Sequence, residues 1–235
     1  LKESVTLNYD KEDITNIKIG FSKKIFDALP FELRQKYYDI INFLKDNNVS
    51  VKNVDIDLLD LAIPTYYIIA TAEASSNLSR FDGIRYGKRV NENNIEEIFS
   101  KTRSKFLGDE VKRRIMLGTY VLSSGYYDDY YNKALKVRNI ITKNLVDHFS
   151  KFDALFLPTT PTTAFEKNEK KDNPLEMYLS DIYTIPMSLA GLPSMSIPIG
   201  EINKLPLGMQ ICSNYLKENT IFIISKFLEN NFLKG

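Results

Sequence analysis

Residues 64–87 read PTYYIIATAEASSNLSRFDGIRYG, and along this segment an apolar helical pattern gives way to small and polar residues. The apolar side chains recur near the helical period, which predicts a helix packed against a core. They are Leu58, Leu61, Ala62, Tyr66, Ile69 and Ala70. The small residues that follow let a ligand or another backbone come close, and polar side chains stand among them: Glu73, Asn77, Arg80 and Asp82. This mixture suits the wall of a cleft; the alternative is an ordinary helix end closed by a turn at Asp82-Gly83.

Strands and helices alternate on either side of this segment. Residues 17–21 and 49–56 alternate as strands, and 30–47 have a helical period, an order that favours α/β layering with a right-handed crossover if the strands are parallel. We expect a turn or loop directly after residue 21. Further expected elements are a helix opened by Asp57, an exposed helix and loop at 91–108, a helix from Asp109 loosened by Gly118, an amphipathic helix at 134–149, a buried strand at 153–157 stopped by Pro158, a surface loop at 159–173, a helical stretch at 175–189 interrupted by Pro186, paired strands at 195–199 and 207–211, and a closing helix at 215–233.

Composition excludes several classes of protein. The net charge of +1 argues against binding nucleic acid through bulk electrostatics, although a local basic face stays open. One cysteine, Cys212, and one histidine, His148, argue against a disulfide scaffold and a zinc cluster. No apolar run approaches the roughly 20 residues of a membrane span. We therefore expect a protein of a reducing, cytosol-like compartment, without membrane contact and cut from a longer chain, since it begins with Leu1.

Six segments in order carry a family resemblance: EASSNLSRFDGIRYG (73–87), EVKRRIMLGT (110–119), LSSGYYD (122–128), PTTPT (158–162), DIYTIP (181–186) and LAGLP (189–193). Together they resemble the A subunits of glutamyl-tRNA(Gln) amidotransferases, a branch of the amidase signature family. The resemblance covers nearly the whole chain but only the C-terminal half of such a subunit. It implies that residues 1–235 are half of one α/β domain, with a mixed β-sheet covered by helices on both faces, and that the half bearing the nucleophile is absent.

The resemblance also implies an activity and its partners. The complete protein hydrolyses glutamine and passes ammonia to a B subunit, which uses ATP and magnesium to amidate the misacylated tRNA, and a C subunit joins the two. The serine nucleophile, a second serine in a cis peptide and a lysine belong to the absent half. We therefore expect no catalytic residue here and no turnover by this chain alone, and we assign packing roles to Ser75, Ser76, Ser123 and Ser124.

Three side chains are candidates for holding the substrate. Arg114 has a guanidinium fork that fits a carboxylate, Asp181 is an acid among apolar neighbours that suits an ammonium group, and Tyr66 can pack its ring while its hydroxyl reaches a ligand. The structural alternatives are a solvated basic turn, a helix-surface acid and a core tyrosine. An arginine, an aspartate and a phenol are the groups that free glutamine requires, and the resemblance places the same three residues at its glutamine site.

Two other functions stay open: a general amidase acting on an uncharged amide, and a non-catalytic assembly module. The sequence contains no phosphate-binding Gly-x-x-x-x-Gly-Lys loop, no Gly-x-Gly-x-x-Gly and no His-rich metal motif, so we expect no cofactor and no metal in this chain. His148 and Cys212 receive no catalytic role. The expected location is the cytoplasm or an organelle with its own translation.

Overall fold

The computed structural model describes residues 13–57, 59–167 and 174–233. The chain divides into two compact units, one formed by Leu1–Ile63 with Arg138–Gly235 and the other by Pro64–Val137. Within the described ranges, every helix is too short or too polar to span a lipid bilayer.

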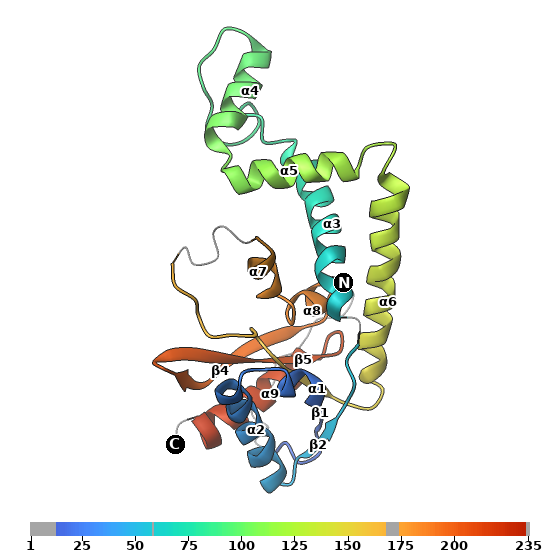
Figure 1. The fold of residues 1–235 in the computed structure, drawn as a ribbon, viewed down its shortest axis with the longest axis vertical. Helices are drawn as coiled ribbons and strands as arrows, with labels where there is room; N and C mark the ends of the chain where they lie inside the picture. Colours follow the sequence, from blue (N-terminus) through green and yellow to red (C-terminus); the bar gives the residue numbers. More distant parts are fainter. Residues whose placement is uncertain (1–12, 58, 168–173, 234–235) are drawn as a thin grey trace. The chain divides into compact units, whose positions relative to one another are not determined.

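The first unit is built on a five-stranded mixed sheet with the order β2-β1-β3-β5-β4 (Figure 1). The strands β2, β1 and β3 are parallel, because β1 pairs in parallel with both β2 and β3, whereas β5 runs antiparallel to β3 and to β4. The strands are β1 (Lys18–Phe21), β2 (Ser50–Asn53), β3 (Ala154–Pro158), β4 (Ser194–Ile202) and β5 (Leu205–Ser213). The predicted strands are confirmed, and so is the α/β class, although β2 is shorter than the alternation at residues 49–56 indicates.

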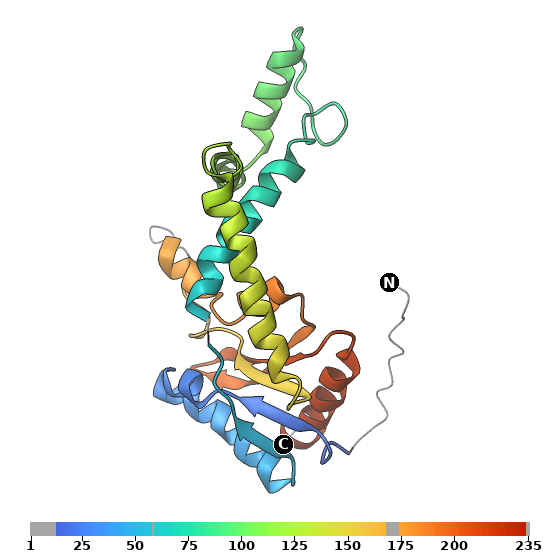
Figure 2. The same ribbon diagram turned by 90° about the vertical axis from the view of Figure 1, so that its right-hand side faces the viewer.

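Helices cover both faces of this sheet. On one face lie α2 (Phe31–Asp46) and α9 (Glu218–Leu228), where the rings of Phe43 and Phe227 have centroids 6.1 Å apart. Figures 1 and 2 show α8 (Ile185–Ala190) on the opposite face from α2. The side chains between the layers are almost fully buried, and the largest include Tyr37, Phe26, Phe156, Ile40, Leu44 and Leu155. This single core holds the first unit together.

Three local predictions for the first unit are wrong. The expected loop after β1 contains a short helix, α1 (Lys23–Asp27), whose first turn is capped by the hydroxyl of Ser22. The expected helical stretch at 175–189 is two helices, α7 (Pro174–Leu179) and α8. Pro186 does not interrupt a helix but lies in the first turn of α8, where its missing N–H costs nothing.

Two further expectations concern the first unit. The closing helix is confirmed as α9, which continues as a π-helical turn, η2 (Glu229–Leu233). Part of the expected surface loop at 159–173 lies outside the described residues, as does Leu58.

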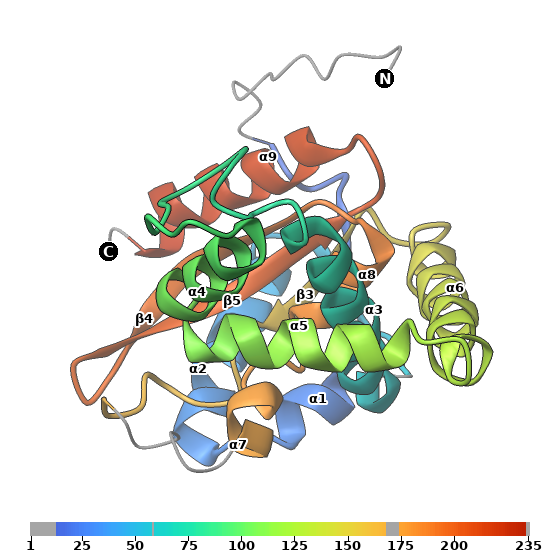
Figure 3. The same cartoon turned by 90° about the horizontal axis from the view of Figure 1, so that it is seen from above.

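The second unit is helical. It contains most of α3 (Leu59–Leu78), then α4 (Ile95–Phe106), α5 (Asp109–Val121) and the π-helix η1 (Tyr127–Asn132), and it ends within α6 (Lys133–His148). Figures 1 and 3 show α5 crossing α3. The helix predicted through residues 64–70 is confirmed. α3 ends at Leu78 in a turn at residues 79–80, and a separate bend at residues 82–87 follows, in which Gly83 has a φ of 81°.

Candidate functional site

Helix α5 crosses α3 at one closely packed point. A β-carbon placed on Gly118 would lie 2.0 Å from the backbone oxygen of Thr71 and 2.6 Å from the Cβ of Ser75, so this approach requires glycine. Next to it, the hydroxyls of Ser75 and Thr119 share a hydrogen bond of 3.0 Å. The expectation that Gly118 loosens the helix is wrong, because α5 continues through Val121. The glycine instead fixes the position of α5 on α3.

Arg114 lies one turn before Gly118, on the same face of α5. Its guanidinium carbon is 5.8 Å from the centroid of the Tyr67 ring on α3, a cation–π contact. Its Nε donates a 2.8 Å hydrogen bond to Oε1 of Glu110. The guanidinium is therefore held from two sides, and its Nη edge is the part that a second anion would take.

Glu110 orients two arginines at once. Arg113 donates to both carboxylate oxygens, from Nε to Oε2 at 2.7 Å and from Nη2 to Oε1 at 2.8 Å, and Arg114 shares Oε1. These hydrogen bonds, led by that of Arg113, lower the pKa of Glu110 to about 2, so the carboxylate is charged throughout the neutral range. In return, the hydrogen bond to Glu110 raises the pKa of Arg114. The pair is an i, i+4 contact along α5, a spacing from which the sequence could have indicated it.

Tyr66 lies beside this arrangement. Its ring packs edge-on against that of Tyr67, with centroids 5.2 Å apart and an interplanar angle of 86°. After Glu110, both phenols contribute to raising the pKa of Arg114. Tyr66 is half-buried, as a residue with a packed ring and an accessible hydroxyl should be. The second unit thus places Arg114 against Tyr67, whose ring packs on Tyr66, and sequence reasoning missed Tyr67. A shared role of Tyr66 and Arg114 in holding a ligand stays a prediction.

Asp181 belongs to the first unit, where it lies in the turn between α7 and α8. It is exposed, and its backbone oxygen accepts from the amides of Thr184 and Ile185. The turn is thereby fixed ahead of α8. Asp181 is neither a residue within a helix nor a buried acid, and its role as an ammonium ligand stays a prediction.

The second unit also contains a cavity of about 370 Å³ where the sequence indicates a cleft wall. Glu73 and Asn77 line it from α3, together with the small residues Ala72 and Ser76. Leu122 and two tyrosines of η1, Tyr127 and Tyr131, complete the lining. The expected combination of small and polar side chains in a cavity wall is confirmed in part, because Arg80 and Asp82 do not line this cavity. The tyrosines are an addition to it, because the π-helical turn that presents them has no sequence signature.

The serines of this unit make structural hydrogen bonds. Ser75 bonds to Thr119, and the hydroxyl of Ser123 donates to the backbone oxygen of Tyr120 at 2.7 Å. These contacts agree with packing roles. Within residues 13–57, 59–167 and 174–233, no group of three or more His, Cys, Asp or Glu side chains is placed to hold a metal ion.

Comparison with known proteins identifies relatives of the whole chain. Residues 3–222 match the sequence profile of the protein family named Amidase. The A subunit of the glutamyl-tRNA(Gln) amidotransferase of Clostridium botulinum (strain Kyoto / Type A2) is 53% identical over 213 residues, which are 90% of this chain and 44% of that protein. The protein of the same name from Clostridium kluyveri is 50% identical over 222 residues, 94% of this chain and 45% of that protein.

Solved structures give the same result for the fold. The crystal structure of the A subunit of the Thermotoga maritima glutamyl-tRNA(Gln) amidotransferase superposes with a TM-score of 0.74 at 35% identity, covering 98% of this chain and 46% of that one. An amidase that is 19% identical superposes with a TM-score of 0.67 and shows the shared fold alone. The chain therefore spans about half the length of the relatives that it matches.

Proposed function

This chain belongs to the amidase family, and from that membership we propose that it is the C-terminal half of the glutamine-hydrolysing A subunit of a tRNA-dependent amidotransferase. Relatives named as A subunits of glutamyl-tRNA(Gln) amidotransferases support this proposal, because they are 50–53% identical over at least 90% of the chain. The single observation that carries the substrate assignment is the oriented guanidinium of Arg114, which Glu110 and the ring of Tyr67 hold in place. It offers a fixed positive charge where α5 crosses α3.

The proposed task of this chain is to hold glutamine rather than to break its amide bond. Arg114 binds the α-carboxylate through its Nη edge, since Glu110 already occupies Nε. Tyr66 borders the site with its phenol. Asp181 is proposed to bind the α-ammonium group. A free amino acid needs both charges, so the clamp selects glutamine over an uncharged amide.

The remaining parts of the reaction are proposed to come from outside this chain. The serine nucleophile, the second serine and the lysine belong to the other half of the protein. The ammonia passes to a B subunit that binds ATP, magnesium and the misacylated tRNA, and a C subunit joins the assembly. We place the complex in the cytoplasm, or in an organelle with its own translation.

The first test measures glutamine binding after complementation with the missing N-terminal half. Removing a charged, hydrogen-bonded contact costs about 2 kcal/mol, so Arg114→Ala should weaken glutamine roughly 30-fold in calorimetry. Arg113→Ala is the matched control, because it removes the same charge from the same helix and the same Glu110 partner. Equal affinity in the Arg114 variant and the wild type would remove Arg114 from the site.

The second test separates the proposed function from its two alternatives. The complemented protein should release ammonia from glutamine, and the 235-residue chain alone should release none. Glutaminase activity of the chain alone would contradict the placement of the nucleophile. Hydrolysis of neutral amides with no competition by glutamine would favour a general amidase, and binding of a B-type partner without any glutamine binding would favour an assembly module.

A further inference from the structure

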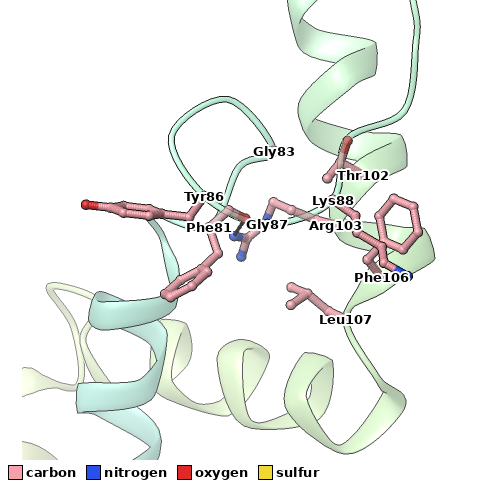
Figure 4. A pocket seen from close by; sticks show the side chains of 9 residues that line it. All are labelled: Phe81, Gly83, Tyr86, Gly87, Lys88, Thr102, Arg103, Phe106 and Leu107. Carbon is pink, nitrogen blue, oxygen red and sulfur yellow. Dashed lines mark hydrogen bonds between the residues drawn. The ribbon is translucent and has the colours of Figure 1, made fainter.

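The tip of the helical unit contains a pocket that the proposed glutamine site does not use. It has a volume of about 340 Å³, at the lower end of the range for small-ligand sites, and lies between the loop after α3 and the end of α4 (Figure 4). Phe81 and Tyr86 line it from the loop, and Phe106 lines it from α4. Figure 4 shows the two loop rings on one side and Phe106 on the other.

The aromatic rings of this pocket are accessible. The exposed fractions are 41% for Phe81, 52% for Tyr86 and 40% for Phe106. The rings of Phe81 and Tyr86 have centroids 5.5 Å apart at an interplanar angle of 39°. Rings that pack only for stability are normally covered, so three open rings around one pocket offer flat surfaces to a planar ligand.

Cations surround the same rings. Residues 79–107 contain seven Lys and Arg against four Asp and Glu, a net charge of +3 in a chain whose total is +1. Lys88 and Lys105 place their Nζ atoms 6.0 and 5.6 Å from the centroid of the Phe106 ring. Arg80 and Arg89 are also exposed, and among the described residues none of these four cations forms an ion pair. The tip is therefore a local basic face on a nearly neutral chain.

The loop that carries these groups is held in one conformation. The carboxylate of Asp82 accepts hydrogen bonds from the backbone amides of Ile84 and Arg85. It also forms an ion pair with the side chain of Arg85, whose Nη2 lies 2.8 Å from Oδ2 of Asp82. Thr102 of α4 accepts from the amide of Val90 at 3.2 Å. A loop fixed in this way binds a partner without a large ordering cost.

A second anchor comes from α4 itself. Nη1 of Arg103 donates to the backbone oxygens of Leu78 and Phe81, at 2.8 and 3.2 Å. This arginine is thus engaged in holding the loop. Four cations that form no ion pair within the described part of the chain are available to a ligand. Lys88 lines the pocket and Lys105 lies over the ring of Phe106, while Arg80 and Arg89 are the sequence neighbours of Phe81 and Lys88.

From these observations we propose that the tip of the helical unit binds single-stranded RNA. One base enters the pocket and stacks on the rings of Phe81, Tyr86 and Phe106, while neighbouring phosphates lie against Arg80, Lys88, Arg89 and Lys105. Exposed aromatic rings combined with a row of cations are the usual features of single-strand sites, because every base has a flat face and every linkage a negative charge. An acidic peptide would satisfy the cations but would leave the rings without a stacking partner. The proposal does not depend on glutamine binding.

The test is fluorescence anisotropy with a labelled single-stranded RNA of eight nucleotides and the same RNA as a duplex. Four phosphate contacts on a single strand give a slope of about −2.8 in log K against log salt. Affinity should therefore fall roughly 50-fold between 50 and 200 mM salt. The double variant Lys88→Gln/Arg89→Gln should reduce that fall to about 7-fold and weaken binding at low salt.

Two further variants make the test specific. Lys23→Gln/Lys24→Gln removes the same charge from exposed positions of α1, outside the pocket, and should leave RNA affinity within about twofold. Tyr86→Leu keeps an apolar side chain but removes the stacking ring, and should weaken the single strand about tenfold while changing the duplex little.

Three results would overturn the proposal. They are no binding of the single strand at 50 mM salt, an equal loss in the α1 control, and displacement of the RNA by a polyglutamate peptide at the same charge concentration. The last would show a surface for acidic proteins instead. Circular dichroism of each variant confirms that it is folded, and glutamine affinity should be the same in all of them. A failure here therefore leaves the proposed function untouched.

Discussion

Replacing Gly118 with alanine is the sharpest test of the α3–α5 crossing. The new β-carbon would lie 2.0 Å from the backbone oxygen of Thr71, whereas non-bonded heavy atoms of this kind need more than about 3 Å. A backbone oxygen cannot rotate away as a side chain can. Helix α5 must therefore move off α3 by roughly 1 Å or more.

The expected cost combines three contributions. Overpacking at such a contact destabilises by about 1–3 kcal/mol. Loss of the hydrogen bond between Ser75 and Thr119 adds about 1 kcal/mol. Alanine has a higher helix propensity than glycine, which stabilises the variant by about 1 kcal/mol. The net loss is about 2 kcal/mol, or a decrease in Tm of roughly 4–8 °C for a chain of this length.

Thermal denaturation followed by circular dichroism measures this change. Gly125→Ala is the control, because its β-carbon would meet nothing within 4 Å and it belongs to the same unit. Its Tm should stay within about 1–2 °C of the wild type. If Gly118→Ala were as stable as the wild type, or more stable, helix propensity alone would govern this position and the close crossing would be refuted.

Two further predictions concern the single histidine and the single cysteine. Burial lowers the pKa of His148, so the unfolded chain takes up the proton first, and the stability that its neutral form provides is lost as the pH falls below about 6.5. Urea midpoints at pH 7.5 and 5.5 should show this loss, and a His148→Gln variant with the same pH slope would contradict the assignment. Burial raises the pKa of Cys212 to about 12, so a thiol reagent at pH 8 should modify it only as the chain unfolds. Labelling of the native chain within seconds would show that the thiol is accessible.

Periodicity predicts much of this fold correctly. The strands β1, β4 and β5 and the long helix α2 repeat apolar residues at the spacing of their element, and β3 is a continuous apolar run of strand length. Each of these patterns lies within one short segment, so it can be recognised from the sequence without knowledge of tertiary contacts.

The wrong predictions share a physical cause. Propensity alone makes Gly118 a weak point of its helix, but its role depends on the carbonyl of Thr71, 47 positions earlier in the chain. The sequence predicts a single helical stretch at residues 175–189, and in such a helix Pro186 would be a break. The chain instead forms two helices, and Pro186 lies at the start of the second. Helix α1 is too short for periodicity to indicate, and only its Ser22 cap marks it. Tertiary contact decides each of these cases.

The candidate site divides in the same way. Tyr66 and Arg114 can be selected from the sequence as candidates, because a glutamine site requires a phenol and a guanidinium. The orientation of Arg114 cannot, since it depends on Tyr67 across the helix crossing as well as on Glu110. The convergence of Asp181 with the other two stays a prediction.

One edge strand of the sheet, β4, has a consequence for handling the protein. β4 contains Pro198, which lacks an amide donor, and a β-bulge follows between Pro198 and Glu201, where Gly200 has a φ of 122°. A kinked border without a full row of donors is a poor template for an added strand. Concentrated solutions of the protein should therefore not form fibrils through the β4 edge. Deleting Gly200, which removes the bulge, should allow strands to add at this edge and fibrils to form.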